Sequence, residues 1–223
     1  MKLFAKPSTA ILGSLSAIVA VFCFSTNDVA IKFISKDYAL HLVVLIRSLV
    51  GLIVLFLFIV PLSGGIKVLY TNRLGLHLLR GFCVVFANIT FFLGLAALPL
   101  AEGVAIFFIS PLLITIFSVV FLKEIVGPRR WAAVTLGLIG VLVILRPGSA
   151  TFQTASLLPL SAAFGYATLH MLTRYIGKTE SAASMSFYIQ LTFLVVCLTL
   201  GLTIGDGKFS GWNDPSLEFL FRA

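Results

Sequence analysis

Seven stretches of this 223-residue chain are almost entirely apolar; six of them are long enough to cross a lipid bilayer, and the fifth becomes so when residues 126–130 before it are included. A spanning helix needs about 20 consecutive, largely apolar residues. Backbone groups in lipid must be hydrogen-bonded within their own segment, so such continuous runs favour helices. The sequence therefore predicts an all-α integral membrane protein, a polytopic helix bundle. Its predicted spans are 11–34, 40–62, 76–98, 100–122, 131–146, 155–176 and 185–205.

The composition supports a membrane protein and argues against a nucleic-acid partner. Hydrophobic residues make up 60% of the chain and charged residues 11%, whereas soluble domains have about 45–50% and about 25%. The net charge of +8 comes from basic residues that stand singly or in pairs between apolar runs. A nucleic-acid binder needs them massed on one surface. Cys23, Cys83 and Cys197 lie within apolar runs without a CxxC motif, so we expect neither a metal nor a cofactor.

The distribution of Lys and Arg predicts that the N-terminus is cytoplasmic. With this orientation, ten basic residues lie in inner loops or at inner helix ends: Lys2, Lys6, Lys67, Arg73, Arg80, Lys123, Arg129, Arg130, Arg174 and Lys178. Four lie outside: Lys36, Arg146, Lys208 and Arg222. Seven spans then place residue 223 outside.

The first and sixth spans resemble each other at an offset of 142 residues. Residues 20–36 align with residues 162–178, sharing five identities, and Arg47 in the second span aligns with Gln190 in the seventh. A five-helix unit that repeats must enter the membrane from opposite sides, which is the inverted repeat of many secondary transporters. Unrelated helices of similar composition are the alternative. The second copy has two helices, so the prediction is one complete domain at 11–148 and an incomplete one at 155–223.

Several motifs resemble the EamA domain of the drug/metabolite transporter superfamily. They are NDVAIKFIS (27–35), LIRSL (45–49), LPLAE (98–102) and the segment 111–148, with Pro111, Leu122-Lys123-Glu124, Arg129-Arg130 and Arg146-Pro147-Gly148. The resemblance implies ten helices in a full-length chain, with both ends cytoplasmic, and transport of a small metabolite across the bacterial cytoplasmic membrane. NDxxxK with LPLAE is similar to bacterial members assigned to S-adenosylmethionine or riboflavin uptake.

Charged residues inside the predicted spans are functional candidates, because a charge in hydrocarbon costs at least about 2.5–3.5 kcal/mol. Asp28, Lys32, Arg47 and Glu102 share the outer half of the bundle, where Asp28 and Lys32 at i and i+4 can neutralise each other. The repeat predicts inner counterparts, namely His170, Arg174 and Gln190. We interpret the two clusters as gates of one pathway.

Each of these residues also has a simpler interpretation. Lys32, Arg80 and Arg174 lie near span ends and can extend toward the headgroups. Asp28 and Arg47 can form a purely structural pair. Glu102 can stabilise the start of its helix or bind a coupling proton.

Three uncharged residues near the middle of the spans complete the candidate site. Pro111 lacks an N–H group, so the carbonyl of Phe107 is free for another partner, which is either a ligand or merely a neighbour of a kinked helix. Asn88 needs a hydrogen-bonding partner within the bundle. Tyr166 can stack on a planar substrate or pack in the core.

The favoured function is a secondary carrier that moves a small organic metabolite by alternating access between inverted halves. An enzyme is disfavoured because the three histidines are far apart and no GxSxG, HExxH, GxGD or Walker A motif is present. The alternative from another class is a non-transporting membrane subunit or a truncated product that needs a partner. Oligomeric state cannot be predicted.

Overall fold

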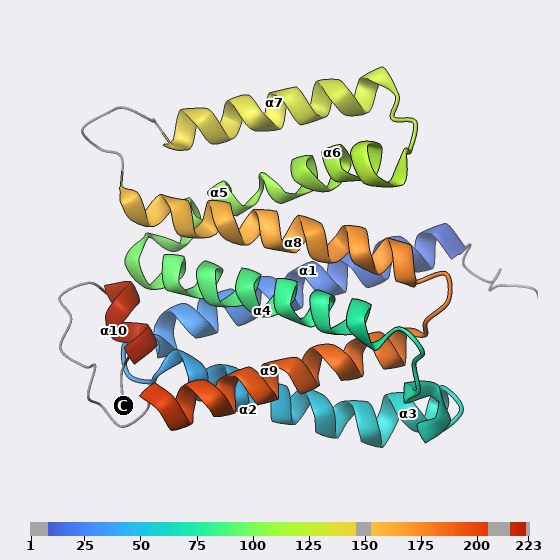
Figure 1. The fold of residues 1–223 in the computed structure, drawn as a ribbon. Coiled ribbons are helices and arrows are strands. Elements are labelled where there is room, and N and C mark those ends of the chain that lie inside the picture. The colour runs from blue at the N-terminus through green and yellow to red at the C-terminus, as the bar shows by residue number, and fades with distance from the viewer. Residues whose placement is uncertain (1–8, 146–152, 205–214, 222–223) are drawn as a thin grey trace, which may run out of the picture.

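The computed structural model describes residues 9–145, 153–204 and 215–221, and within these ranges it contains helices, turns and loops but no strand. The long helices run side by side (Figure 1). The elements are α1 (Thr9–Ile34), α2 (Leu40–Val54), η1 (Leu55–Ile59), α3 (Val60–Leu62), η2 (Ile66–Leu69), α4 (Leu74–Ala97), α5 (Leu100–Phe107), α6 (Ser110–Leu122), α7 (Pro128–Leu145), η3 (Thr154–Ser156), α8 (Leu157–Ile176), α9 (Ala182–Ile204) and α10 (Pro215–Phe221).

The predicted polytopic helix bundle is confirmed. Six helical segments of the described residues are long and apolar enough to cross a membrane, and they match six predicted spans within a few residues. The remaining predicted span, 131–146, corresponds to α7. Residues 146–148 of the Arg-Pro-Gly motif lie outside the described residues, as does 205–214 of the predicted second domain.

Small side chains let α8 approach α4 closely at the centre of the bundle. Ala162, Ala163 and Ala167 on α8 are fully buried. At Gly165 an added Cβ would lie 2.8 Å from the Phe86 ring of α4, so only glycine fits. In lipid there is little hydrophobic force between helices, and small residues promote association by allowing close van der Waals packing. The most buried helix is therefore α4, which packs against both α8 and α9.

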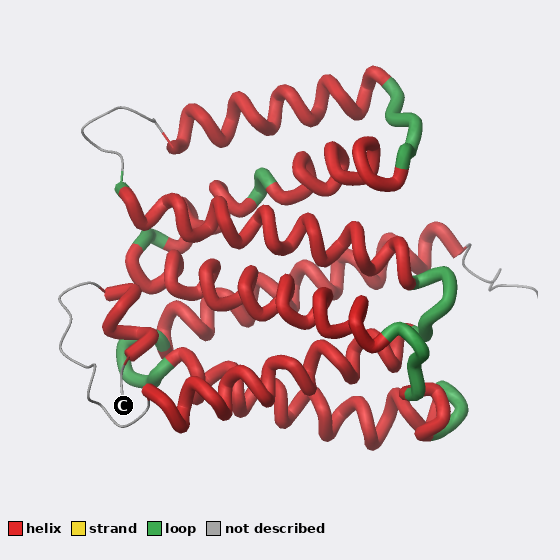
Figure 2. The backbone as a smooth tube through the Cα atoms, viewed as in Figure 1, coloured by secondary structure: helices red, strands yellow, loops and turns green. Residues whose placement is uncertain are grey.

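Two prolines interrupt spans that otherwise read as continuous helices. Pro61 cannot donate a backbone hydrogen bond, and the helix widens into the π-helical turn Leu55–Ile59 just before it. The span Leu100–Leu122 is divided into α5 and α6, with a break at Phe108 and Ile109 (Figure 2). Pro111 lies in the first turn of α6, where its missing N–H is tolerated. The predicted interruption by Pro111 is thus confirmed.

In contrast to α4, α1 and α7 leave most of their apolar side chains exposed. Phe22 on α1 is 71% exposed, and Leu136 on α7 is 69% exposed. In a membrane such faces contact lipid or further helices. The buried and polar contacts of the bundle are concentrated instead around α2, α4, α8 and α9.

Candidate functional site

A cavity of about 410 Å³ lies beside the break between α5 and α6. It brings together five residues that the sequence singled out from five different helical segments: Asp28, Arg47, Asn88, Pro111 and Tyr166. Phe107 and Phe108 line it from the break itself. A broken helix beside a cavity that holds a few polar side chains is typical of transporter binding sites. The cavity is therefore the strongest candidate for a solute-binding site among the described residues.

Arg47 of α2 is the best-positioned cation in this cavity. Its Nη2 donates a hydrogen bond to Asn88 Oδ1 at 3.0 Å, and Asn88 in turn donates from Nδ2 to the Val84 carbonyl at 3.0 Å. The Arg47 Cζ lies 5.4 Å from the centre of the Phe92 ring and 5.2 Å from that of Phe193. Cation–π contacts of this kind hold a guanidinium in one orientation.

Asp28 faces the same cavity from α1 without a direct ion pair to Arg47. Its Oδ1 accepts a hydrogen bond of 3.4 Å from Asn27 Nδ2. Among the described residues, no ion pair within 4.0 Å joins Asp28 to either Arg47 or Lys32. The predicted neutralisation of Asp28 by Lys32 is therefore wrong.

The amine of Lys32 turns to the C-terminal end of α4 instead. It donates hydrogen bonds to the carbonyls of Leu95, Ala96 and Leu98. The last carbonyls of a helix lack intrahelical partners and carry the negative end of its dipole, so they attract an ammonium group. Lys32 consequently ties α1 to the end of α4 and does not line the cavity.

Aromatic rings form one wall of the cavity. The Phe91 and Phe107 rings are 4.6 Å apart, and Phe107 lies 5.2 Å from Tyr166. The Tyr166 ring is in turn 4.4 Å from the His170 ring. The chain has 21 phenylalanines, so no single one was predicted to matter. The structure brings Phe91, Phe107 and Tyr166 into the same cavity as the polar residues of α1 and α2.

Another cavity, of about 340 Å³, is also lined by Arg47 and reaches Gln190 of α9. It shares Phe24, Asn27, Arg47 and Asn88 with the first cavity. The Gln190 amide occupies the space where a side chain at position 51 would lie, so Gly51 is required for this approach. The residue predicted as the counterpart of Arg47 therefore lies in the same cavity system.

A polar network joins α4 to α8 and α9 at the end of the bundle where α4 begins. Arg80 donates from Nε to Thr173 Oγ1 at 2.8 Å and from Nη1 to the Met185 carbonyl at 3.2 Å. Its side chain is only 5% exposed. The interpretation of Arg80 as a residue that extends to the headgroups is wrong, because both partners lie inside the bundle.

Glu180, in the turn between α8 and α9, belongs to the same network. Its Oε1 accepts a hydrogen bond of 2.8 Å from Thr71, and its Oε2 lies 3.4 Å from Nε2 of the fully buried His77. Burial alone would raise the pKa of this carboxyl. Hydrogen bonds from Thr71 and Ser184 and the attraction of the nearby His77 outweigh burial and hold the pKa below its ordinary value of 4.5.

Arg174 connects α8 to the end of α6 at this same end of the bundle. It donates from Nη1 to Ser118 Oγ at 2.8 Å, and its Nη2 lies 2.8 Å from Glu124 Oε1. Lys123, in the left-handed conformation with φ of +55°, ends α6 and places Glu124 there. The sequence did not single out Glu124, Glu180, His77 and Thr71 as site residues. Charged and polar residues are common near span ends, so their presence there does not show that they lie inside the bundle.

Glu102 lies apart from these groups. It occupies the first turn of α5, is partly exposed, and lines neither of the two cavities that contain Arg47. Within the described residues, no group of three His, Cys, Asp or Glu side chains is arranged to hold a metal ion.

Comparison with known proteins gives consistent matches. The profile of the EamA-like transporter family matches residues 11–146. A riboflavin transporter from Vibrio cholerae is 32% identical over 207 residues, covering 92% of this chain and 67% of the relative. An S-adenosylmethionine uptake transporter from Rickettsia bellii is 29% identical over 181 residues, covering 81% and 62%. A pseudopaline exporter from Pseudomonas aeruginosa is 24% identical over 203 residues, covering 91% and 67%. No solved structure gives a significant match.

Proposed function

Because this chain belongs to the EamA-like transporter family, we propose that it functions as a secondary transporter for a small organic metabolite. The chain spans about two thirds of the length of the curated relatives that it matches. The transporter would lie in the bacterial cytoplasmic membrane with its N-terminus inside. The observation that carries the proposal is the cavity where Asp28, Arg47 and Asn88 meet the break between α5 and α6.

The proposed mechanism is alternating access, with the solute held between two halves of the bundle that rock against each other. In the described state, Arg80, Arg174 and Glu180 tie residues 9–145 to residues 153–204 at the end where α4 begins. These contacts support closure of the pathway at that end. Opening there requires that the three side chains exchange their partners.

Substrate uptake into proteoliposomes that contain the purified full-length protein tests this proposal. Riboflavin and S-adenosylmethionine are the first substrates to try, because relatives carry these names. Uptake above that of protein-free liposomes, saturable with substrate concentration, is the expected result. If a wide panel of metabolites shows no uptake in either direction while the protein is inserted and folded, the alternative of a non-transporting subunit is favoured.

Proton coupling is tested separately at Glu102. The carboxylate in the first turn of α5 stabilises the helix by about 0.3–1 kcal/mol whatever its role in transport. If it also carries a proton, uptake at equal pH on both sides of the membrane changes with pH, and Glu102→Gln removes that change. Uptake that is the same at mildly acidic and mildly alkaline pH contradicts coupling through this residue.

A further inference from the structure

Arg47 carries a positive charge inside a predicted span without a negative partner in contact. It makes one hydrogen bond to a side chain, the neutral Asn88. Among the described residues, no carboxylate oxygen lies within 4.0 Å of its guanidinium. A guanidinium has five N–H donors, so most of them have no partner in the described part of the chain. Charges at this depth almost always pair with another group.

The surroundings of Arg47 fix its position without placing a carboxylate in contact with it; Asp28 lines the same cavity but lies more than 4.0 Å from the guanidinium. The rings of Phe92 on α4 and Phe193 on α9 lie 5.4 Å and 5.2 Å from the guanidinium carbon. Such rings orient a cation, and the guanidinium N–H groups without a protein partner remain available to a planar anion. An arginine edge binds a carboxylate through two parallel hydrogen bonds. The site is thus preorganised for a carboxylate.

Arg47 also stands where the two cavities meet. It lines the cavity beside the α5–α6 break and the cavity beside Gln190. An anionic group of the solute can therefore bind to Arg47 from either cavity, and the guanidinium does not have to move far. A transport pathway needs this arrangement if a charged group of the solute passes from one cavity to the other while it stays bound to Arg47.

Building on the proposed transport function, we propose that Arg47 is the binding site for a carboxylate of the solute, whose apolar or aromatic part lies against Phe91, Phe107 and Tyr166. One guanidinium balances the single charge of a carboxylate. A phosphate dianion would leave a net negative charge facing Asp28, which lines the same cavity. The part of the solute that binds Arg47 is therefore a carboxylate with a single negative charge, alone or in a zwitterion, and not a phosphate ester.

Binding of three matched probes to the purified full-length protein tests this assignment without requiring transport. Benzoate, benzamide and phenyl phosphate share an aromatic ring and differ in the charge of the attached group. The thermal unfolding midpoint should rise with benzoate, and the fitted affinity should exceed that for benzamide by about tenfold. Phenyl phosphate should bind more weakly than benzoate. Equal effects of benzoate and benzamide, or no effect of benzoate, overturn the proposal.

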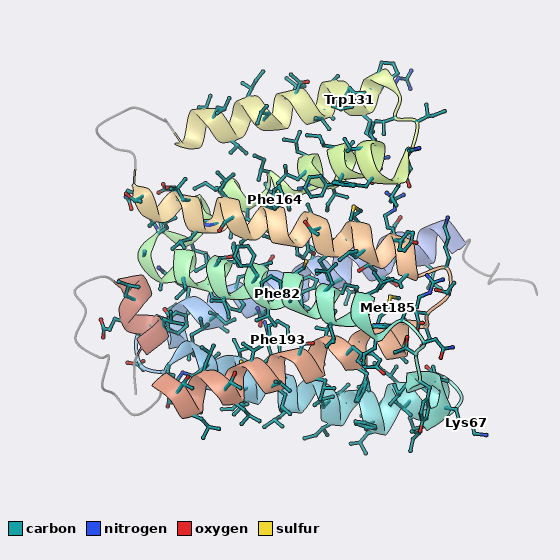
Figure 3. The ribbon with its side chains drawn as sticks, in the orientation of Figure 1. Lys67, Phe82, Trp131, Phe164, Met185 and Phe193 are labelled. Carbon is teal, nitrogen blue, oxygen red and sulfur yellow. The ribbon has the colours of Figure 1, made fainter. Side chains whose placement is uncertain are left out.

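Variants assign the effect to Arg47. Arg47→Gln should remove the difference between benzoate and benzamide. Lys67→Gln should keep it, because this variant removes one positive charge from an exposed side chain that points away from the bundle (Figure 3). If Arg47→Gln does not fold, Asp28→Asn decides, because loss of the nearby negative charge should tighten benzoate binding. Weaker benzoate binding in Asp28→Asn contradicts the proposal.

These results are distinguishable from the outcome of the transport assay. Selective benzoate binding with no solute uptake would leave the Arg47 site in place and count against the transport function. Uptake of neutral solutes with no preference for benzoate would support transport and refute the carboxylate site.

Discussion

At the scale of single residues, the bundle uses the cations within its spans in different ways. Arg80 and Lys32 are engaged by hydrogen-bond acceptors on neighbouring helices, as the carbonyl partners of Lys32 illustrate. Arg47 alone among these three lines a cavity and faces aromatic rings. The first two cations therefore stabilise the helix arrangement, and the third is available to a solute.

Arg80→Gln should destabilise the protein more than a comparable change on the surface. The substitution removes a guanidinium that is hydrogen-bonded to Thr173 and to the Met185 carbonyl and is almost fully buried. Hydrogen bonds to charged groups contribute about 1.5–3 kcal/mol, so we expect the free energy of unfolding to fall by about 2 kcal/mol. Reversible unfolding in mixed detergent micelles measures this change. The exposed Arg73→Gln is the control, and equal stability of both variants contradicts the role assigned to Arg80.

At the scale of elements, the interruption of one span shapes the cavity. Phe107, Phe108, Ser110 and Pro111 all line it, and all belong to the junction of α5 and α6. A continuous helix would turn some of these residues away, since neighbouring residues in a helix face different directions. The break therefore positions the aromatic wall relative to Arg47.

Pro111→Ala should reduce transport while changing stability little. Alanine supplies an N–H group for the Phe107 carbonyl and allows α5 and α6 to join into one helix. Proline is tolerated in the first turn of a helix, so the free energy of unfolding should change by less than about 1 kcal/mol. The initial uptake rate and the unfolding curve are measured on the same preparation, with Pro128→Ala at the start of α7 as the control. An unchanged uptake rate in Pro111→Ala shows that the break is not needed.

The sequence was most informative about the elements and least informative about side-chain partners. The spans followed from apolar length, and the break followed from the missing N–H of Pro111. The convergence of Asp28, Arg47 and Asn88 was predicted in outline, because polar groups in lipid must face each other. The partner of Lys32 was not predicted, since helix-end carbonyls are backbone groups that leave no mark in the sequence. The rings of Phe92 and Phe193 were equally hidden among the many phenylalanines.

At the scale of the whole molecule, two regions with different tasks lie at different depths of the bundle. The two cavities that share Arg47 occupy one region. The network of Arg80, Arg174 and Glu180 occupies the end where α4 begins and α8 ends, at the right in Figure 1. We expect that alternation between two states changes the second region while the first holds the solute.

Acidification should weaken the network at Glu180. Its pKa in the folded protein lies below the ordinary value of 4.5, so its contribution to stability is complete above that pH and is lost as the pH falls through the lower, folded value. The unfolding midpoint of the wild type should therefore drop more steeply below about pH 4.5 than that of Glu180→Gln. Other carboxylates titrate in both proteins, so the difference between the two plots of unfolding midpoint against pH isolates the contribution of Glu180. Parallel curves would show that Glu180 does not contribute.

Solute flux through variants of the cavity tests most directly whether this cavity is the solute pathway. Initial uptake rates are compared for wild type, Asp28→Asn, Arg47→Gln and the exposed Lys67→Gln, at equal amounts of inserted and folded protein. We expect Arg47→Gln to reduce flux by at least about tenfold, as loss of a charged contact worth about 1.4 kcal/mol or more implies, and Lys67→Gln to match the wild type. Asp28→Asn should also reduce flux, because an anion that is held more tightly at Arg47 is released more slowly. Wild-type flux in both cavity variants would contradict the claim that this cavity is the solute pathway.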